Sequence, residues 1–179
     1  MSHTQEQAVK NWLGTFVREL ASTRHGAERM RAATERFVKH RDIPPRQMWY
    51  VTCDADGGSR GNEHWRWIVE TSLDEQGRWV ANGVSGGSGP VPRRGRPWAD
   101  LGGNWGPAGF RAGGTVEDAG TGIARVRLTD VEGHSFEDAV ENGVVLFSSD
   151  RPVAMPMRLE LIDREGSVVE TDEWGFVDE

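Results

Sequence analysis

Ile123-Ala124-Arg125-Val126-Arg127-Leu128 opens the stretch, residues 123–171, that decides the fold of this chain. Val126 and Leu128 alternate with arginines, as in a strand with one apolar and one polar face. Similar runs follow, separated by turn residues, at 134–140, 144–147, 157–161 and 167–171. Asn142-Gly143 predicts a type I′ turn, because both central residues of that turn need positive φ. The stretch therefore predicts an antiparallel meander.

The same alternation recurs towards the N-terminus, at residues 47–52, 64–72 and 78–84. We therefore expect a mainly β protein: an antiparallel, immunoglobulin-like β-sandwich of about eight to ten strands over residues 46–179. Residues 83–114 break the pattern, since they are rich in Gly and Pro with tryptophans between them. A long aperiodic stretch inside a compact domain is usually a functional or mobile loop. We predict a loop at about 83–114 that its tryptophans hold in place.

Residues 1–45 predict an N-terminal helical segment that packs on the same domain. Thr4 with Gln7 matches a capping box, and apolar residues follow at helical spacing. Two arrangements fit residues 4–40. One is a single helix with a weak heptad seam, which would give a homo-oligomer through the helices. The other is two helices joined near His25-Gly26 and laid on the sheet, and the glycines Gly14 and Gly26 favour it.

Composition limits the function. The chain has 179 residues, 36% hydrophobic and 27% charged, which suits one soluble globular domain. Residues 1–100 carry 15 Lys and Arg against 12 Asp and Glu, whereas residues 101–179 carry 6 against 16. An acidic β-rich half argues against a nucleic-acid surface. The single cysteine, Cys53, excludes an intramolecular disulfide and a multi-cysteine metal site. No secretory signal and no apolar span are present, so we expect a cytoplasmic protein without a membrane partner.

Several segments from the meander together carry a resemblance. They are residues 122–128, 140–147, Asp150-Arg151-Pro152 and 159–163. Over about residues 98–175 the chain resembles uncharacterised bacterial β-sandwich proteins. The shared motifs are structural, so the resemblance implies a fold and no activity.

The candidate catalytic and metal motifs each lack their context. Gly83-Val84-Ser85-Gly86-Gly87 matches G-x-S-x-G, but the following Ser88-Gly89-Pro90 cannot start the helix that a nucleophile elbow needs. Asp54-Ala55-Asp56-Gly57-Gly58 opens like a calcium loop but lacks the later ligands. His64 follows Glu63 at a predicted strand start, without a paired histidine. We therefore predict no catalytic residue, no metal and no cofactor, with Ser85 in a flexible Gly-Ser turn and Cys53 as an inert thiol.

Two sets of residues remain as candidate binding sites. Arg93, Arg94 and Arg96 form the one dense basic cluster, next to Trp98. Guanidinium groups beside an aromatic ring suit an anionic ligand or an acidic protein surface. The alternative is a solvated loop that pairs with the acidic half of the chain. A second hypothesis is a small-molecule pocket lined by tryptophans, namely Trp65, Trp67, Trp79, Trp98 and Trp105.

These observations favour a soluble, non-catalytic interaction module whose partner is an unknown protein or a small anionic ligand. The alternative is a small-molecule-binding protein or cofactor-free enzyme with a tryptophan-lined pocket. A nucleic-acid binder that uses the arginine cluster is the least favoured, because the chain carries an excess of acidic residues.

Overall fold

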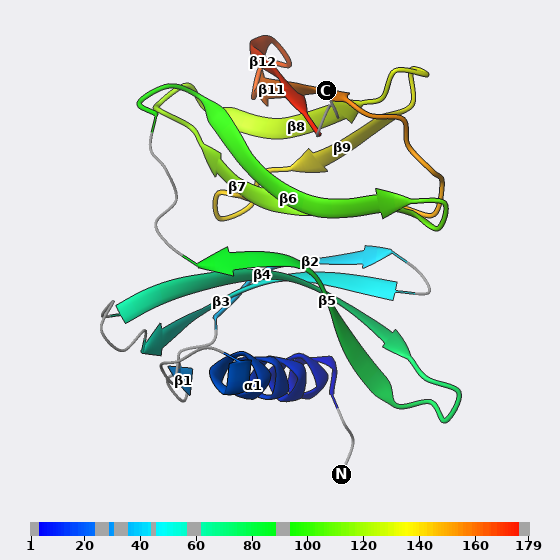
Figure 1. Cartoon of the computed structure of the whole chain (residues 1–179). Helices are drawn as coiled ribbons and strands as arrows, with labels where there is room; N and C mark the ends of the chain where they lie inside the picture. The colour runs from blue at the N-terminus through cyan, green and yellow to red at the C-terminus, as the bar shows by residue number, and fades with distance from the viewer. Residues whose placement is uncertain are drawn as a thin grey trace. The chain divides into compact units, whose positions relative to one another are not determined.

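The computed structural model of the chain describes residues 4–23, 29–30, 36–43, 46–56, 62–88 and 94–175. Over these residues the protein is mainly β, with three antiparallel sheets and one helix (Figure 1). The chain divides into two compact units, residues 1–90 and 91–179. Within the described residues, no helix combines the length and the apolar character that crossing a membrane requires.

The first unit begins with the helix α1 (Gln5–Thr23), and its predicted cap is confirmed. Thr4 Oγ1 accepts a hydrogen bond from the backbone N–H of Gln7 at 3.3 Å, which satisfies one of the free donors of the first turn. Val9 and Leu13 are fully buried in a core that α1 shares with the adjoining sheet. The helix therefore uses these two apolar residues for packing on its own unit.

The second predicted helix is wrong, because residues 36–43 form a strand. β2 (Arg36–Ile43) pairs antiparallel with β3 (Arg46–Asp56), so a single helix over 4–40 is also excluded. The rings of Phe37 and His40 pack on Trp49 of β3, with centroid distances of 5.5 and 4.6 Å. Pairing and aromatic contact outweigh the helical spacing of the sequence. The predicted hinge at His25-Gly26 lies outside the described residues.

The sheet of the first unit has the strand order β1-β3-β4-β5, and β2 also pairs with β3. Its remaining strands are β1 (Arg29–Met30), β4 (Asn62–Leu73) and β5 (Trp79–Ser88). The three predicted strands correspond to β3, β4 and β5. The predicted boundary near residue 45 falls between β2 and β3, inside this sheet, so the described part of residues 1–45 contains strands as well as the helix α1.

The second unit consists of two sheets. One has the order β10-β7-β6, and the other has the order β12-β11-β8-β9. The strands of the first are β6 (Trp98–Gly106), β7 (Gly109–Glu117) and β10 (Val144–Ser149). Those of the second are β8 (Ile123–Thr129), β9 (Ser135–Ala139), β11 (Met157–Asp163) and β12 (Val168–Trp174).

Both sheets of the second unit contribute to one core. The three-stranded sheet supplies Phe110, Ala112, Val145 and Phe147, and the four-stranded sheet supplies the partners that follow: Ile123, Val126, Leu128, Met157, Leu159 and Leu161. The predicted strands of the meander are therefore present. The meander itself is interrupted, because β10 belongs to the other sheet. Asn142 and Gly143 do form the predicted turn, with φ of 53° and 72°.

The predicted loop over residues 83–114 is wrong, since β5, β6 and β7 cover most of it. Gly102 lies directly opposite Gly113 in the β6–β7 pair, and Leu101 lies opposite Gly114. A Cβ atom on Gly114 would collide with the carbonyl oxygen of Asp100. These glycines allow the backbones of two paired strands to approach closely. Because a glycine-rich segment is also typical of a loop, the sequence pattern led to the wrong prediction.

Each edge strand of the three-stranded sheet is bonded to one side chain from the other sheet. The indole N–H of Trp174 on β12 donates to the carbonyl of Leu101 on β6 at 3.0 Å. The carboxylate of Asp138 on β9 accepts from the N–H of Leu146 on β10 at 2.6 Å. Two side chains thus satisfy backbone groups that an edge strand otherwise exposes.

Candidate functional site

The arginine cluster pairs with acidic residues of its own unit. The carboxylate of Glu117 accepts hydrogen bonds from Arg94 N (2.8 Å), Gly95 N (3.2 Å) and Trp98 Nε1 (2.9 Å). The Arg94 guanidinium lies 4.1 Å from the centroid of the Trp98 ring. Arg96 forms an ion pair with Glu170 at 2.9 Å, and Arg93 lies outside the described residues. Arg96 thus pairs with a carboxylate of its own chain, whereas the Arg94 side chain stacks on Trp98 and only the Arg94 backbone contacts Glu117.

The five predicted pocket tryptophans belong to different parts of the molecule. Trp65 and Trp67 stack at 5.5 Å in the helix-side core of the first unit. Trp98 is buried beside Glu117, and Trp105 packs edge-on against Trp174 in the second unit. Trp79 is half-buried opposite Leu73 at the start of β5. Ring packing holds Trp65, Trp67 and Trp105, and a hydrogen bond to Glu117 holds Trp98, whereas the buried indole nitrogen of Trp65 has no hydrogen-bond partner among the described residues.

Ser85 lies in the middle of β5, paired with Ile68, so it stands neither on a nucleophile elbow nor in a flexible turn. The glycines around it receive aromatic rings. A Cβ on Gly83 would collide with the ring of Trp12, and one on Gly86 would collide with Trp67. The G-x-S-x-G match therefore reflects aromatic packing between α1, β4 and β5.

His64 pairs with Asp54 across β3 and β4, with Nδ1 and Oδ1 2.8 Å apart. Both side chains are about half exposed, at 52% and 48%. Asp54 is the one hydrogen-bonding partner of the His64 ring in the described part of the chain. Cys53 is a free cysteine buried in the core between α1 and the sheet of the first unit. Asp54 and Asp56 lie on β3, and Gly57-Gly58 of the predicted calcium loop lies outside the described residues.

Three hairpins share a turn that we name the Asp-x-x-Gly hairpin. It occurs at Asp74–Arg78 between β4 and β5, at Asp130–His134 between β8 and β9, and at Asp163–Ser167 between β11 and β12. In each, the aspartate carboxylate accepts the backbone N–H of the fifth residue, at 2.8, 2.8 and 2.7 Å. The glycine adopts positive φ, at 71°, 88° and 87°.

Hydrogen bonds keep two of these aspartates ionised. The backbone N–H of Arg78, followed by its guanidinium, lowers the pKa of Asp74. Burial raises the pKa of Asp130, but the backbone N–H and the ring of His134 outweigh that effect, so this pKa also lies below its usual value. The local sequence predicts these segments only as turns. The repeated pattern Asp-x-Glu/Gln-Gly was the available indication of their shared chemistry.

The Asp130–His134 hairpin lies beside a cavity of about 370 Å³. One carboxylate oxygen each of Asp130 and Glu132 and one ring nitrogen of His134 lie within 4.8 Å of one another. Oxygen and imidazole nitrogen atoms are of the types that bind metal ions. Asp130 Oδ1 already accepts from the N–H groups of Glu132 and His134, and Oδ2 accepts from His134 Nδ1 at 3.0 Å. The contacts of the Asp130 carboxylate thus serve the turn itself, and they point to no bound metal.

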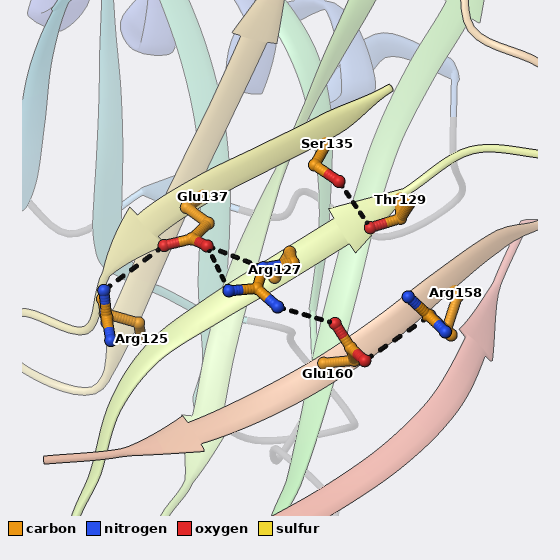
Figure 2. Close-up of polar contacts among 7 residues, drawn as sticks. All are labelled: Arg125, Arg127, Thr129, Ser135, Glu137, Arg158 and Glu160. Carbon is orange, nitrogen blue, oxygen red and sulfur yellow. Dashed lines mark hydrogen bonds and ion pairs between the residues drawn. The ribbon is translucent and has the colours of Figure 1, made fainter. Parts of the chain in front are cut away.

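The outer face of the four-stranded sheet carries a row of ion pairs across three strands, which we name the arginine face (Figure 2). Arg127 bonds Glu137 through Nε at 2.6 Å and Glu160 through Nη1 at 3.2 Å. Arg125 and Arg158 extend the row at longer distances, 3.5 Å to Glu137 and 3.5 Å to Glu160. Their side chains are 45% and 59% exposed. The hydrogen bond to Glu137, supported by Glu160, raises the pKa of Arg127.

Comparisons with known proteins add no relative: no family model matches the chain, and neither a curated protein nor a solved structure matches it.

Proposed function

We propose that this protein is a non-catalytic interaction module that binds an acidic protein surface through the arginine face. The single observation that carries the proposal is the exposed pair Arg125 and Arg158, placed on either side of the fixed Arg127. Arginine is enriched at protein interfaces because its planar guanidinium offers five donors. Arg125 and Arg158 each make one long ion-pair contact within the row, so most of their donors stay available.

Preorganisation supports the same surface. Arg127 is held between Glu137 and Glu160, and the strands below it are pinned by a shared core. A partner that binds an ordered surface loses less side-chain entropy. The arginine cluster at residues 93–96 offers a partner fewer available guanidinium groups, because Arg94 stacks on Trp98 and Arg96 pairs with Glu170.

The proposal includes an immunoglobulin-like architecture for the second unit alone. Lettered in chain order A to G, its strands give one sheet of A, B and E, and another of C, D, F and G. The constant-type immunoglobulin fold has ABED and CFG, so the two orders differ in the sheet to which strand D belongs. The resemblance to uncharacterised bacterial β-sandwich proteins covers the same residues, about 98–175, and fits this proposal. Such a fold carries many functions, so the argument for binding rests on the surface.

A matched pair of variants tests the proposal. Arg125→Gln with Arg158→Gln removes two exposed charges and leaves Arg127 with its partners. Arg94→Gln with Arg96→Gln removes two charges from the arginine cluster. We expect cross-linked partners to be lost only in the first variant, and to be lost from the wild type as NaCl rises from about 50 to 500 mM. Partner profiles that are the same for both variants and insensitive to salt would exclude the arginine face.

A further inference from the structure

The cavity beside the Asp130–His134 hairpin lies at one end of the four-stranded sheet. The end of β8, the turn after it, the start of β11 and the end of β12 all contribute to its lining. Its volume of about 370 Å³ falls in the range of small-ligand sites. Val131, Pro156 and Met157 supply apolar walls, and Met157 is fully buried. These walls suit an aliphatic chain.

The charged lining of the cavity is dominated by carboxylates. Asp130 has a side chain with 0% exposure, and its negative charge is held in place by the turn. Glu173 lines the cavity from β12 and has no ion-pair partner among the residues that the structure describes. Arg158 also lines the cavity, but its Nε lies 3.5 Å from Glu160 on the arginine face (Figure 2). Arg158 lies directly opposite Glu173 in the β11–β12 pair, so a positive charge in the cavity would meet two carboxylates and one guanidinium group.

The two carboxylates offer different contacts. The oxygens of Asp130 are occupied by donors from its own turn, so Asp130 contributes its charge without a new hydrogen bond. The carboxylate of Glu173 can accept directly. An ammonium group needs only one strong acceptor and a negative surrounding potential, whereas a metal ion needs several free oxygens.

We propose that this cavity binds a primary ammonium group on a short aliphatic chain, as in a lysine side chain or a free alkylamine. The ammonium group donates to Glu173 and lies in the field of Asp130. The aliphatic chain lies on Val131 and Pro156. This site shares Arg158 with the arginine face, but it differs from that surface in selecting a cation rather than an anion.

A titration of purified, ¹⁵N-labelled full-length protein tests the proposal by NMR. The probes are Nα-acetyl-lysine N-methylamide, 1,5-diaminopentane and the neutral Nα-acetyl-norleucine N-methylamide. We expect saturable shifts of the amides of Val131, Gly133 and Glu173 with both amines and none with the norleucine compound. Tighter binding of the lysine amide would identify a peptide side chain as the ligand source, and equal binding would identify the amine alone.

Variants locate the charge that is responsible. Glu173→Gln should weaken amine binding about tenfold, the value of one charge-assisted hydrogen bond. Glu165→Gln, in the exposed turn between β11 and β12, removes the same charge away from the cavity lining and should leave binding unchanged. Added salt should weaken amine binding to the wild type, which tests the proposal even if Glu173→Gln disturbs the fold. Equal binding of the norleucine compound, shifts spread over the whole chain, or equal effects of the two variants would overturn it.

Discussion

The Asp74 and Asp130 hairpins have the same backbone and different surroundings. In both, the glycine N–H donates to the aspartate carbonyl, at 2.9 and 3.0 Å, and the carboxylate accepts the N–H of the fifth residue. The Asp74 side chain is 19% exposed and pairs with Arg78, whereas the Asp130 side chain is 0% exposed and pairs with His134. Local sequence thus determines the turn, while burial determines how strongly the protein depends on it.

The largest expected effect comes from Asp130→Ala. The change leaves the N–H groups of Glu132 and His134 without their acceptor in a partly buried turn. We expect a loss of about 2–3 kcal/mol in the free energy of unfolding of the second unit. Asp74→Ala should cost the first unit clearly less, because water can replace the carboxylate there. Urea denaturation of each variant provides the measurement, and equal losses would contradict the role given to burial.

Replacing the turn glycines tests what the two hairpins share. Gly77 and Gly133 both have positive φ, and neither has an atom within 4 Å of the position that a Cβ would take. The cost of alanine is then the backbone strain alone, about 1–2 kcal/mol at each position. Thermal unfolding of Gly77→Ala and Gly133→Ala should give similar losses. A much larger loss at Gly133 would show that the surroundings affect the backbone as well.

Acid should weaken both hairpins. Each aspartate has a folded-state pKa below the ordinary value of 3.8, so its contribution is fully present above that value. The contribution is lost as the pH falls through the lower, folded-state pKa. We expect urea midpoints to decrease between about pH 5 and pH 2, and to decrease less in Asp130→Asn than in the wild type. If the urea midpoint changed with pH equally in both proteins, Asp130 would not contribute to the loss of stability in acid.

The smallest effect should come from exchanging the fifth residue. His134→Arg gives the second hairpin the pair found in the first, and we expect a change below about 0.5 kcal/mol at neutral pH. Urea denaturation of the variant and the wild type at neutral pH would test this. A large loss would mean that the imidazole ring has a packing role that an arginine cannot fill.

Sequence reasoning succeeded where a short segment determines its own structure. Thr4 caps α1 through its hydroxyl, and Asn142-Gly143 adopts the positive φ values that its turn type needs. The alternating runs became β8 and β11 because each of these strands has one face in a shared core. In the first two cases the decisive interactions are made by residues close in sequence. In the strands, a simple two-residue period indicates which side chains face the core.

Sequence reasoning failed where distant pairing decides. Phe37 and His40 have helical spacing with their neighbours, but their contact with Trp49 places them in a strand. Gly114 suggested a loop because no local sequence pattern indicates that the carbonyl oxygen of Asp100 occupies the space that a Cβ would need. The arginine face was missed for the same reason, since Arg127, Glu137 and Glu160 come from three strands. The Asp130 cavity likewise depends on segments more than 20 residues apart in sequence.

The hydrogen bond from Trp174 to Leu101 has a consequence for self-association. β12 is the last strand that the structure describes, and β11 is its one neighbour in the sheet. A strand in this position is the element that identical chains exchange when they swap domains. The indole joins β12 to the opposite sheet, so detaching the strand also breaks a contact outside its own hairpin. We therefore expect replacement of Trp174 by Phe to make β12 easier to detach.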